Sequence, residues 1–277
     1  MKQRKGFSYA RYGYLFSLPF IVAFCIFSLY PTIYTALLGF TDCKGLGNTT
    51  WHFLTDEPFK NFVSVLQNPS FIKSLGNTVK LWIMNFIPQI TLAGQGFFKV
   101  VFYMPNIITA ASVAILFNAL FGYPTGPVND LLMTTGVLST PFNFSINATA
   151  AQLIVAFIQF WMWYGYTMII LISGVLGISP EIYEAAEIDG ANDVQLFFQI
   201  TIPNLKTILL YTLITSMIGG LNMYDIPKLF LLGGPDNATL TTSVFIYNQA
   251  FSGSYLYNRA AAASMIMFLI IAVFSGV

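Results

Sequence analysis

The chain has 277 residues, of which 56% are hydrophobic, 17% aromatic and only 8% charged, with a formal net charge of +1. Soluble domains are about 25% charged, so this composition excludes an ordinary water-soluble globule and favours lipid as the main solvent of the chain. Lys and Arg are few and scattered, which argues against a nucleic-acid partner. A membrane protein is therefore predicted.

Six segments are long and apolar enough to cross a bilayer as helices, since about 20 residues at 1.5 Å each are needed. We predict an all-α membrane protein with a cytoplasmic N-terminal segment, 1–11, and a transmembrane domain, 12–277. Basic residues before the first span keep the N-terminus in the cytoplasm, and an even number of spans returns the C-terminus to the same side. The spans are expected near 12–38, 72–93, 97–121, 152–176, 205–226 and 257–277.

The connections between these spans differ in character. The outer segments "CKGLGNTT", "FGYPTGPVND" and "LLGGPDNATL" are rich in Gly, Pro and Asn, which predicts loops. By contrast, the second span has only "LAGQGFF" in which to turn back, and the last span ends abruptly. We expect residues to be missing from this sequence near Ala93 and Gly94 and after Val277.

The sequence lacks the residue patterns that metal sites, disulfides and ATP-binding sites require. His52 is the single histidine, and the two cysteines, Cys25 and Cys43, have no metal-site or disulfide pattern. A Gly-Lys pair does not occur, so the chain has no P-loop lysine for binding ATP. We therefore predict no catalytic residue, no metal site and no cofactor in this chain.

The fourth predicted span carries an aromatic cluster at mid-depth, where anchoring at the membrane interface does not explain it. Gln159, Trp163 and Tyr166 share one helical face at i, i+4 and i+7. Aromatic rings that stack on sugar faces, with an amide for the hydroxyls, would suit a substrate pathway. Packing of this face against neighbouring helices is an equally open interpretation.

The fifth predicted span has polar residues toward its outer end. Asn222 and Tyr224 are candidates for the substrate pathway, because polar groups within a span usually face a cavity or a bundle interior. For Asp225 we favour a structural pairing with Lys228, one helical turn later. Residues 219–220 are both Gly, which allows a close helix approach or a break that lines a cavity.

An acidic stretch lies between the fourth and fifth spans, in residues 179–203. Ser179 is a good N-cap and Pro180 fits the first helical position. Residues 189–192 should break this helix before a second amphipathic turn at 194–201. We expect two short helices with a bend on the cytoplasmic face, where acidic residues face water or another protein, since the inner leaflet is anionic.

The stretch "EAAEIDGANDVQLFFQITIP" resembles the EAA loop of permease subunits of binding-protein-dependent ABC importers. The segments "RYGYLFSLPFIVAFCIFSLYPTIYTALLGFTD", "GFFKVVFYMPNIIT" and "LLGGPDNATLTTSVFIYNQAF" resemble the carbohydrate-uptake type of these permeases, so the likeness covers nearly the whole chain. In that family the loop is the coupling helix that docks on the ATPase. The resemblance implies this role for Glu184, Ala185, Ala186, Asp189, Gly190 and Ala191.

The resemblance further implies a type I permease subunit in the cell membrane of a prokaryote. Its expected partners are a second, different permease, two ABC ATPases that bind ATP and Mg, and an extracellular protein that delivers a sugar or oligosaccharide. The alternatives are a stand-alone channel or ion-driven transporter, which should carry charges along its spans, and an intramembrane enzyme, which should carry a reactive set. The sequence provides neither feature.

Overall fold

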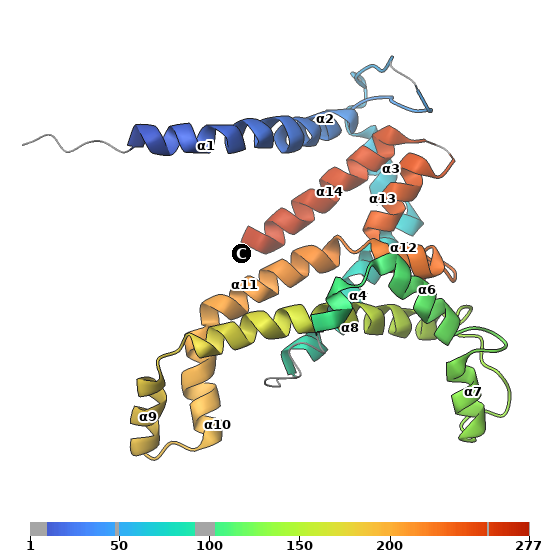
Figure 1. Ribbon diagram of the computed structural model, residues 1–277. Coiled ribbons are helices and arrows are strands. Elements are labelled where there is room, and N and C mark those ends of the chain that lie inside the picture. The colour runs from blue at the N-terminus through green and yellow to red at the C-terminus, as the bar shows by residue number, and fades with distance from the viewer. Residues whose placement is uncertain (1–9, 48–49, 92–102, 254, 277) are drawn as a thin grey trace, which may run out of the picture. The chain divides into compact units, whose positions relative to one another are not determined.

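The computed structural model describes residues 10–47, 50–91, 103–253 and 255–276 (Figure 1). The regular elements in these ranges are helices, as predicted, and β-pairing there is limited to an isolated bridge between Thr41 and Phe53. The chain divides into two units. The first comprises residues 1–65 and 248–268, and the second comprises residues 66–247 and 269–277.

The first unit begins with a long apolar helix made of α1 (Ala10–Phe24), the π-helix η1 (Cys25–Leu29) and α2 (Tyr30–Leu38). Pro31 has no N–H to donate to the preceding turn, and the π-helical turn lies directly before it. The most apolar 18-residue window of Gly13–Leu38 has a mean hydropathy of 1.9, and none of its residues is buried. A helix that is apolar on all sides fits the predicted first span.

Buried asparagines hold the loop that follows this helix. Asn61, in α3 (Lys60–Leu66), donates from Nδ2 to the carbonyl oxygens of Gly39 at 2.9 Å and Thr41 at 2.8 Å. Its Oδ1 accepts a hydrogen bond from Nδ2 of Asn258 at 3.1 Å. Both asparagines are buried, and because their amides are satisfied their burial is not penalised.

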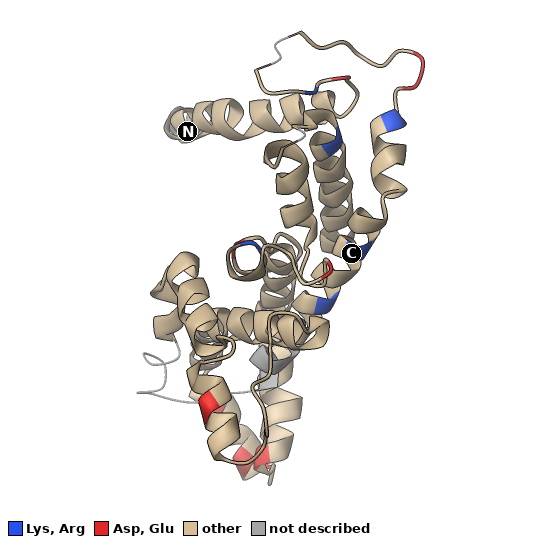
Figure 2. Cartoon of the chain, turned by 90° about the vertical axis from the view of Figure 1, so that its right-hand side faces the viewer, with Lys and Arg blue, Asp and Glu red and all other residues tan. Residues whose placement is uncertain are grey.

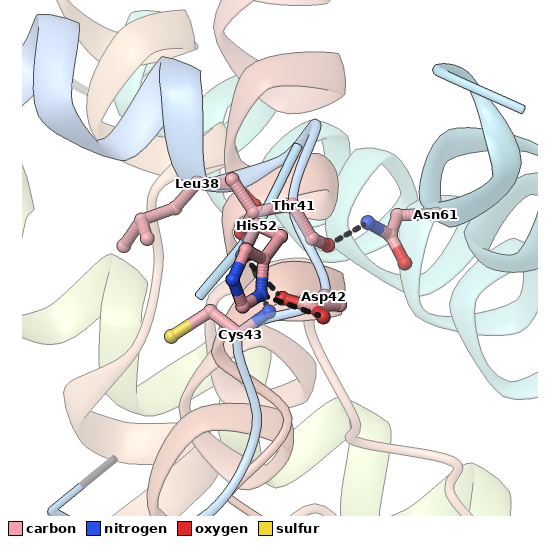
Figure 3. Close-up of polar contacts among 6 residues, drawn as sticks. All are labelled: Leu38, Thr41, Asp42, Cys43, His52 and Asn61. Carbon is pink, nitrogen blue, oxygen red and sulfur yellow. Dashed lines mark hydrogen bonds and ion pairs between the residues drawn. The ribbon is translucent and has the colours of Figure 1, made fainter. Parts of the chain in front are cut away.

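Figure 3 shows the polar contacts of the same loop. The carboxylate of Asp42 accepts a hydrogen bond from the backbone N–H of His52 at 2.7 Å, and His52 Nδ1 lies 3.8 Å from its other oxygen. Burial, together with the negative charge of Asp42, raises the pKa of the Cys43 thiol. The thiol of Cys43 is therefore protonated at neutral pH.

The second unit is a bundle around α8 (Ala148–Leu176), a helix of 29 residues. Side chains from four helices meet in its core, where Leu81, Phe117, Val155, Ile158 and Ile226 are all buried. The other elements of this unit are α4 (Pro69–Thr91), α6 (Ala110–Leu120), α7 (Pro127–Thr134), α9 (Pro180–Ile188), α10 (Asp193–Gln195), η2 (Leu196–Thr201), α11 (Ile202–Leu221) and α12 (Asp225–Leu231), while α13 (Thr242–Phe251) and α14 (Tyr257–Gly276) contribute to both units.

Polar side chains of α4 and α8 bind the connection between α12 and α13, residues 232–241. Nε2 of Gln152 donates to the carbonyl oxygen of Ala238 at 2.7 Å, and Nδ2 of Asn77 donates to that of Leu240 at 3.1 Å. Ala238 and Leu240 are themselves buried. The predicted outer loop is therefore packed into the second unit, and its backbone groups are satisfied by side chains of the bundle.

At two of the predicted spans the helices have other bounds than the span, and the span boundaries themselves stay predictions. The expected third span, 97–121, is interrupted, because the helical residues 103–107 are followed by a break and α6 begins only after Thr109, whose hydroxyl caps the N–H of Ser112. The expected fifth span, 205–226, ends at Leu221, and the chain turns before α12. In both places a short polar side chain satisfies backbone groups at a helix end, so the helix stops inside an apolar run.

Four helical segments of the described residues are long and apolar enough to cross a membrane: Gly13–Leu38, Ala148–Leu176, Asp193–Leu231, which includes the turn between α11 and α12, and Tyr257–Gly276. The helix α4 has 23 residues but carries the polar residues that bind residues 232–241. The count of six spans and the cytoplasmic termini stay predictions. The junction near Ala93 and Gly94 lies outside the described residues.

Candidate functional site

A cavity of about 220 Å³ lies within the second unit, between α8, α11 and the start of α12. Its wall also includes Asn85 from α4 and Ala110 from α6. The side chains around it combine aromatic rings with amides and hydroxyls, and the polar and aromatic members are Asn85, Gln159, Trp163, Tyr166, Thr167, Thr212, Thr215, Ser216, Asn222, Tyr224 and Asp225. Such a lining is typical of a small-molecule site, in which a few polar groups orient a ligand against apolar surface.

The three residues predicted on one face of the fourth span line this cavity together. Gln159 is only 6% exposed, whereas Trp163 and Tyr166 are 46% and 40% exposed, with ring centroids 6.1 Å apart and ring planes at 88°. Within the described residues, the Gln159 amide has no hydrogen-bond partner. The i, i+4, i+7 spacing thus places an amide and two rings on one wall of an open space.

The neighbouring aromatics of α8 have a different environment. Trp161 packs against the hydrophobic core, 5.7 Å from the ring of Phe117, and Tyr164 is buried beside Phe160. The aromatic cluster of the sequence is therefore two sets of side chains on opposite sides of one helix. Trp161 and Tyr164 pack inside the bundle, whereas Gln159, Trp163 and Tyr166 line the cavity.

Asn222 and Tyr224 also line the cavity, from the turn that joins α11 to α12. Nδ2 of Asn222 donates to the carbonyl oxygen of Ile218 at 2.9 Å, and the ring of Tyr224 lies 5.3 Å from that of Tyr247. Lys228 extends its ammonium over the same Tyr247 ring, 4.7 Å from the centroid. The pairing of Asp225 with Lys228 stays a prediction, and Asp225 is itself a residue of the cavity wall.

The helix α11 supplies a polar wall that sequence reasoning missed. Thr212, Thr215 and Ser216 line the cavity, and each hydroxyl donates to a backbone carbonyl three or four residues earlier, at 2.8 to 3.1 Å. Gly219 continues the same face, at i+7 from Thr212. This spacing was a readable signal, because small and hydroxyl residues repeated at helical spacing within a span favour a helix–helix or cavity face.

Gly219 and Gly220 have different roles. A side chain at Gly220 would lie 2.2 Å from Cδ1 of Trp82, so this glycine permits the close approach of α11 to α4. At Gly219 nothing lies within 4 Å of the same position. The prediction of a close helix approach is thus confirmed at Gly220, and Gly219 leaves room in the cavity.

The acidic stretch contains the predicted first short helix and the bend, but its second helix is not short, because α10 and η2 run on directly into α11. The first helix, α9, starts after Ser179, and Gly190 has a φ of +84°, which ends it in the left-handed region. Asn192 and Gln195 then form a capping box that starts α10, with bonds of 3.0 and 2.9 Å. The chain continues through η2 into α11 without a further loop.

The six residues assigned to ATPase coupling lie on α9 and its terminal bend. Glu184, Ala185, Asp189 and Gly190 are exposed, and Ala186 and Ala191 are partly buried. Residues 179–203 contain five acidic side chains and no Lys or Arg, so one sign of charge gathers there (Figure 2). Apolar side chains are exposed beside these charges: Ile188 is 86%, Val194 64% and Phe198 61% exposed.

A side-chain hydrogen bond joins α9 to the start of the helix that lines the cavity. The hydroxyl oxygens of Tyr183 and Thr201 lie 3.0 Å apart, and Thr201 is buried in the last turn of η2. The Thr201 hydroxyl is also 3.2 Å from the carbonyl oxygen of Leu196. The orientation of α9 is therefore tied to the end of the helical rod formed by η2 and α11.

Groups of three or more His, Cys, Asp or Glu that could hold a metal ion do not occur in the described residues. Apart from the carboxylate of Asp225, the cavity provides neutral hydrogen-bonding groups and ring faces. It can therefore bind and orient a polar organic molecule, and its chemistry is that of recognition.

The comparisons agree with this picture. The model of the family described as "Binding-protein-dependent transport system inner membrane component" matches residues 75–277. Among curated relatives, the lactose transport system permease protein LacF of Rhizobium radiobacter is 31% identical, over 95% of this chain and 91% of its own length. The multiple sugar-binding transport system permease protein MsmF of Streptococcus mutans is 27% identical, over 95% of this chain and 92% of its own length.

Solved structures show the same fold. A chain of a bacterial ABC transporter involved in the import of the acidic polysaccharide alginate has a TM-score of 0.77 at 22% identity, and the match covers 97% of this chain and 95% of that one. A second structure contains the alginate transporter in complex with a periplasmic protein bound to an alginate pentasaccharide, with a TM-score of 0.75. Since the family model covers well over half of the sequence, this chain belongs to the binding-protein-dependent transport system inner membrane components, the permease subunits of ABC importers.

Proposed function

We propose that the cavity between α8 and α11 is this chain's part of the path along which a sugar or oligosaccharide crosses the membrane. The observation that carries the proposal is the meeting of Gln159, Trp163, Tyr166, Asn222 and Tyr224 around one space, although they come from two different segments. Flat rings stack on the apolar faces of sugars, and amides bind their hydroxyl groups. The relatives named for lactose and multiple sugars support cargo of this class.

The acidic loop is the proposed docking element for an ABC ATPase. Ile188, Val194 and Phe198 are exposed next to charged side chains, and a mixed apolar and charged surface of this kind suits a groove on another protein. Two ATPases would bind ATP and Mg, and their closure would act on the six residues assigned to coupling. A second, different permease would complete the path, and an extracellular sugar-binding protein would deliver the cargo at the cell membrane of a prokaryote.

The test separates docking from insertion. In Glu184→Lys the charge of one motif residue is reversed, and in Gly190→Val a branched side chain is placed at a φ of +84°. Both variants should insert in the membrane yet lose at least about tenfold of uptake of a radiolabelled oligosaccharide, because docking interfaces depend on a few residues. The ATPase should also fail to copurify with them.

Matched controls exist on the same loop. Glu187→Lys makes the same charge change at an exposed position of α9 outside the assigned set, and Gly190→Asn introduces a residue that tolerates a positive φ. Both controls should retain most of the uptake and the ATPase. Normal uptake in Glu184→Lys and Gly190→Val would exclude the assigned coupling role.

A further inference from the structure

The formal charge of the cavity wall has a single sign, which is negative. Asp225 is the one formally charged side chain among the lining residues, and this wall contains no Lys, Arg or His from the described part of the chain. The remaining polar groups are amides, hydroxyls and phenols. Among the described residues, a negatively charged ligand in this cavity therefore meets a carboxylate and no cation.

Asp225 is placed where a ligand would meet it. It is the first residue of α12 and is exposed, next to the pathway candidates Asn222 and Tyr224. The basic residue nearest in sequence, Lys228, has its ammonium over the Tyr247 ring and is not part of the cavity wall. Asp225 is thus an exposed residue of the cavity wall, and the ammonium of Lys228 lies over an aromatic neighbour.

We infer that Asp225 makes the path selective for cargo charge: it admits neutral and amino sugars and disfavours acidic ones such as uronates. This inference rests on the proposed sugar path and names the class of sugar. The shared fold leaves the charge of the cargo open, because the structural neighbours belong to a transporter of an acidic polysaccharide. The charge of the cavity wall determines which cargo charge is favoured. Like and unlike charge pairs differ most in interaction energy where a cavity restricts access of water.

If Asp225 only stabilised α12, its replacement would have consequences different from those of a loss of charge selectivity. An acidic residue in the first turn of a helix stabilises that helix, and α12 is short. If that were its whole function, replacing it would change the amount of folded protein but would leave the ratio of affinities for neutral and acidic ligands unchanged. The informative readout is therefore this ratio.

The experiment measures binding to the assembled importer in lipid nanodiscs, through quenching of tryptophan fluorescence by three disaccharides. The probes are lactose, which is neutral, a glucosamine dimer at mildly acidic pH, which is cationic, and a galacturonate dimer, which is anionic. The part of the quenching that disappears in Trp163→Phe reports occupancy of the cavity. For charges roughly 8 Å apart in a partly screened site, the anionic dimer should require about tenfold higher concentration than lactose.

In Asp225→Asn this gap should shrink to less than about threefold, because the amide keeps the size and loses the charge. The gap in the unmodified chain should also narrow when salt rises from about 0.01 M to about 1 M, which shortens the Debye length from roughly 30 Å to roughly 3 Å. This second measurement needs no variant, so it holds even if Asp225→Asn folds poorly.

Each outcome has one meaning. Equal binding of the galacturonate dimer and lactose, or a gap that neither Asp225→Asn nor salt changes, overturns the role of Asp225 and leaves the sugar path intact. If none of the three disaccharides gives quenching that depends on Trp163, the sugar path itself is wrong and the inference falls with it.

Discussion

The cavity and the acidic loop of the second unit differ in how their residues are held. Around the cavity, Ile158 and Met162 are buried at 0% and 7% exposure and fix the helix that presents Gln159 and Trp163. In the loop, Ile188 is 86% exposed. A site for a small ligand is positioned by the packing of its own chain, whereas a site for a protein partner keeps its apolar groups free for that partner.

The largest expected effect concerns the packing of the helices that hold the cavity in place. In Gly220→Ala the new Cβ would lie 2.2 Å from Cδ1 and 2.8 Å from Cβ of Trp82, so the helices α11 and α4 must move apart. Overpacking of this kind costs about 3 kcal/mol, and the melting temperature of the purified protein in detergent should fall clearly.

Gly219→Ala is the matched control for this change. It makes the same substitution one residue earlier in α11, where nothing lies within 4 Å of the added carbon. Its melting temperature should stay equal or rise slightly, since Ala favours the helix. Equal melting temperatures of the two variants would show that α11 and α4 are not in close contact.

The next effect concerns the rings that the packed helix presents. Trp163→Ala removes a half-exposed ring from the cavity wall and should lower oligosaccharide uptake about tenfold, because stacked aromatics are frequent hot spots of recognition. Phe157→Ala is its control, since Phe157 is 52% exposed on the same helix but does not line the cavity. A similar loss of uptake in both variants would indicate general damage to α8.

The α8 face of the cavity was predictable because helical periodicity relates Gln159, Trp163 and Tyr166 without any tertiary information. The α11 face was harder to identify, because hydroxyls within a span often bond back to their own helix, as those of Thr212 and Thr215 do. The early end of α11 at Leu221 was missed since the apolar run continues beyond it. The cavity needs both faces, so periodicity alone identified half of it.

In the acidic loop, local structure was predictable from the sequence and the tertiary contact was not. The start of α9, the bend and the start of α10 were predictable from local signals, since Pro180, Gly190 and Asn192 act on the backbone next to them. The bond between Tyr183 and Thr201 was not predictable, because it depends on how the chain folds back over 18 residues. Local chemistry defines the parts of this loop, and their connection to α11 depends on tertiary structure.

The smallest expected effect is that of removing the hydrogen bond between Tyr183 and Thr201. Tyr183→Phe removes the hydroxyl that lies 3.0 Å from the buried hydroxyl of Thr201 and leaves the ring in place. A single hydrogen bond of this kind contributes about 1 kcal/mol, so sugar transported per ATP hydrolysed by the assembled importer should fall by roughly threefold to fivefold. ATPase binding should not change, because the motif residues on α9 are untouched.

Two controls decide whether this bond transmits the movement of the ATPase. Tyr211→Phe makes the same change at an exposed position of α11 and should leave the transport ratio unchanged. Thr201→Ser keeps the hydroxyl partner and should retain most of the ratio, whereas Thr201→Val should reproduce the loss. If Tyr183→Phe and Thr201→Val both transport normally, α9 acts on α11 through the backbone of η2 alone, and the bond only stabilises the resting loop.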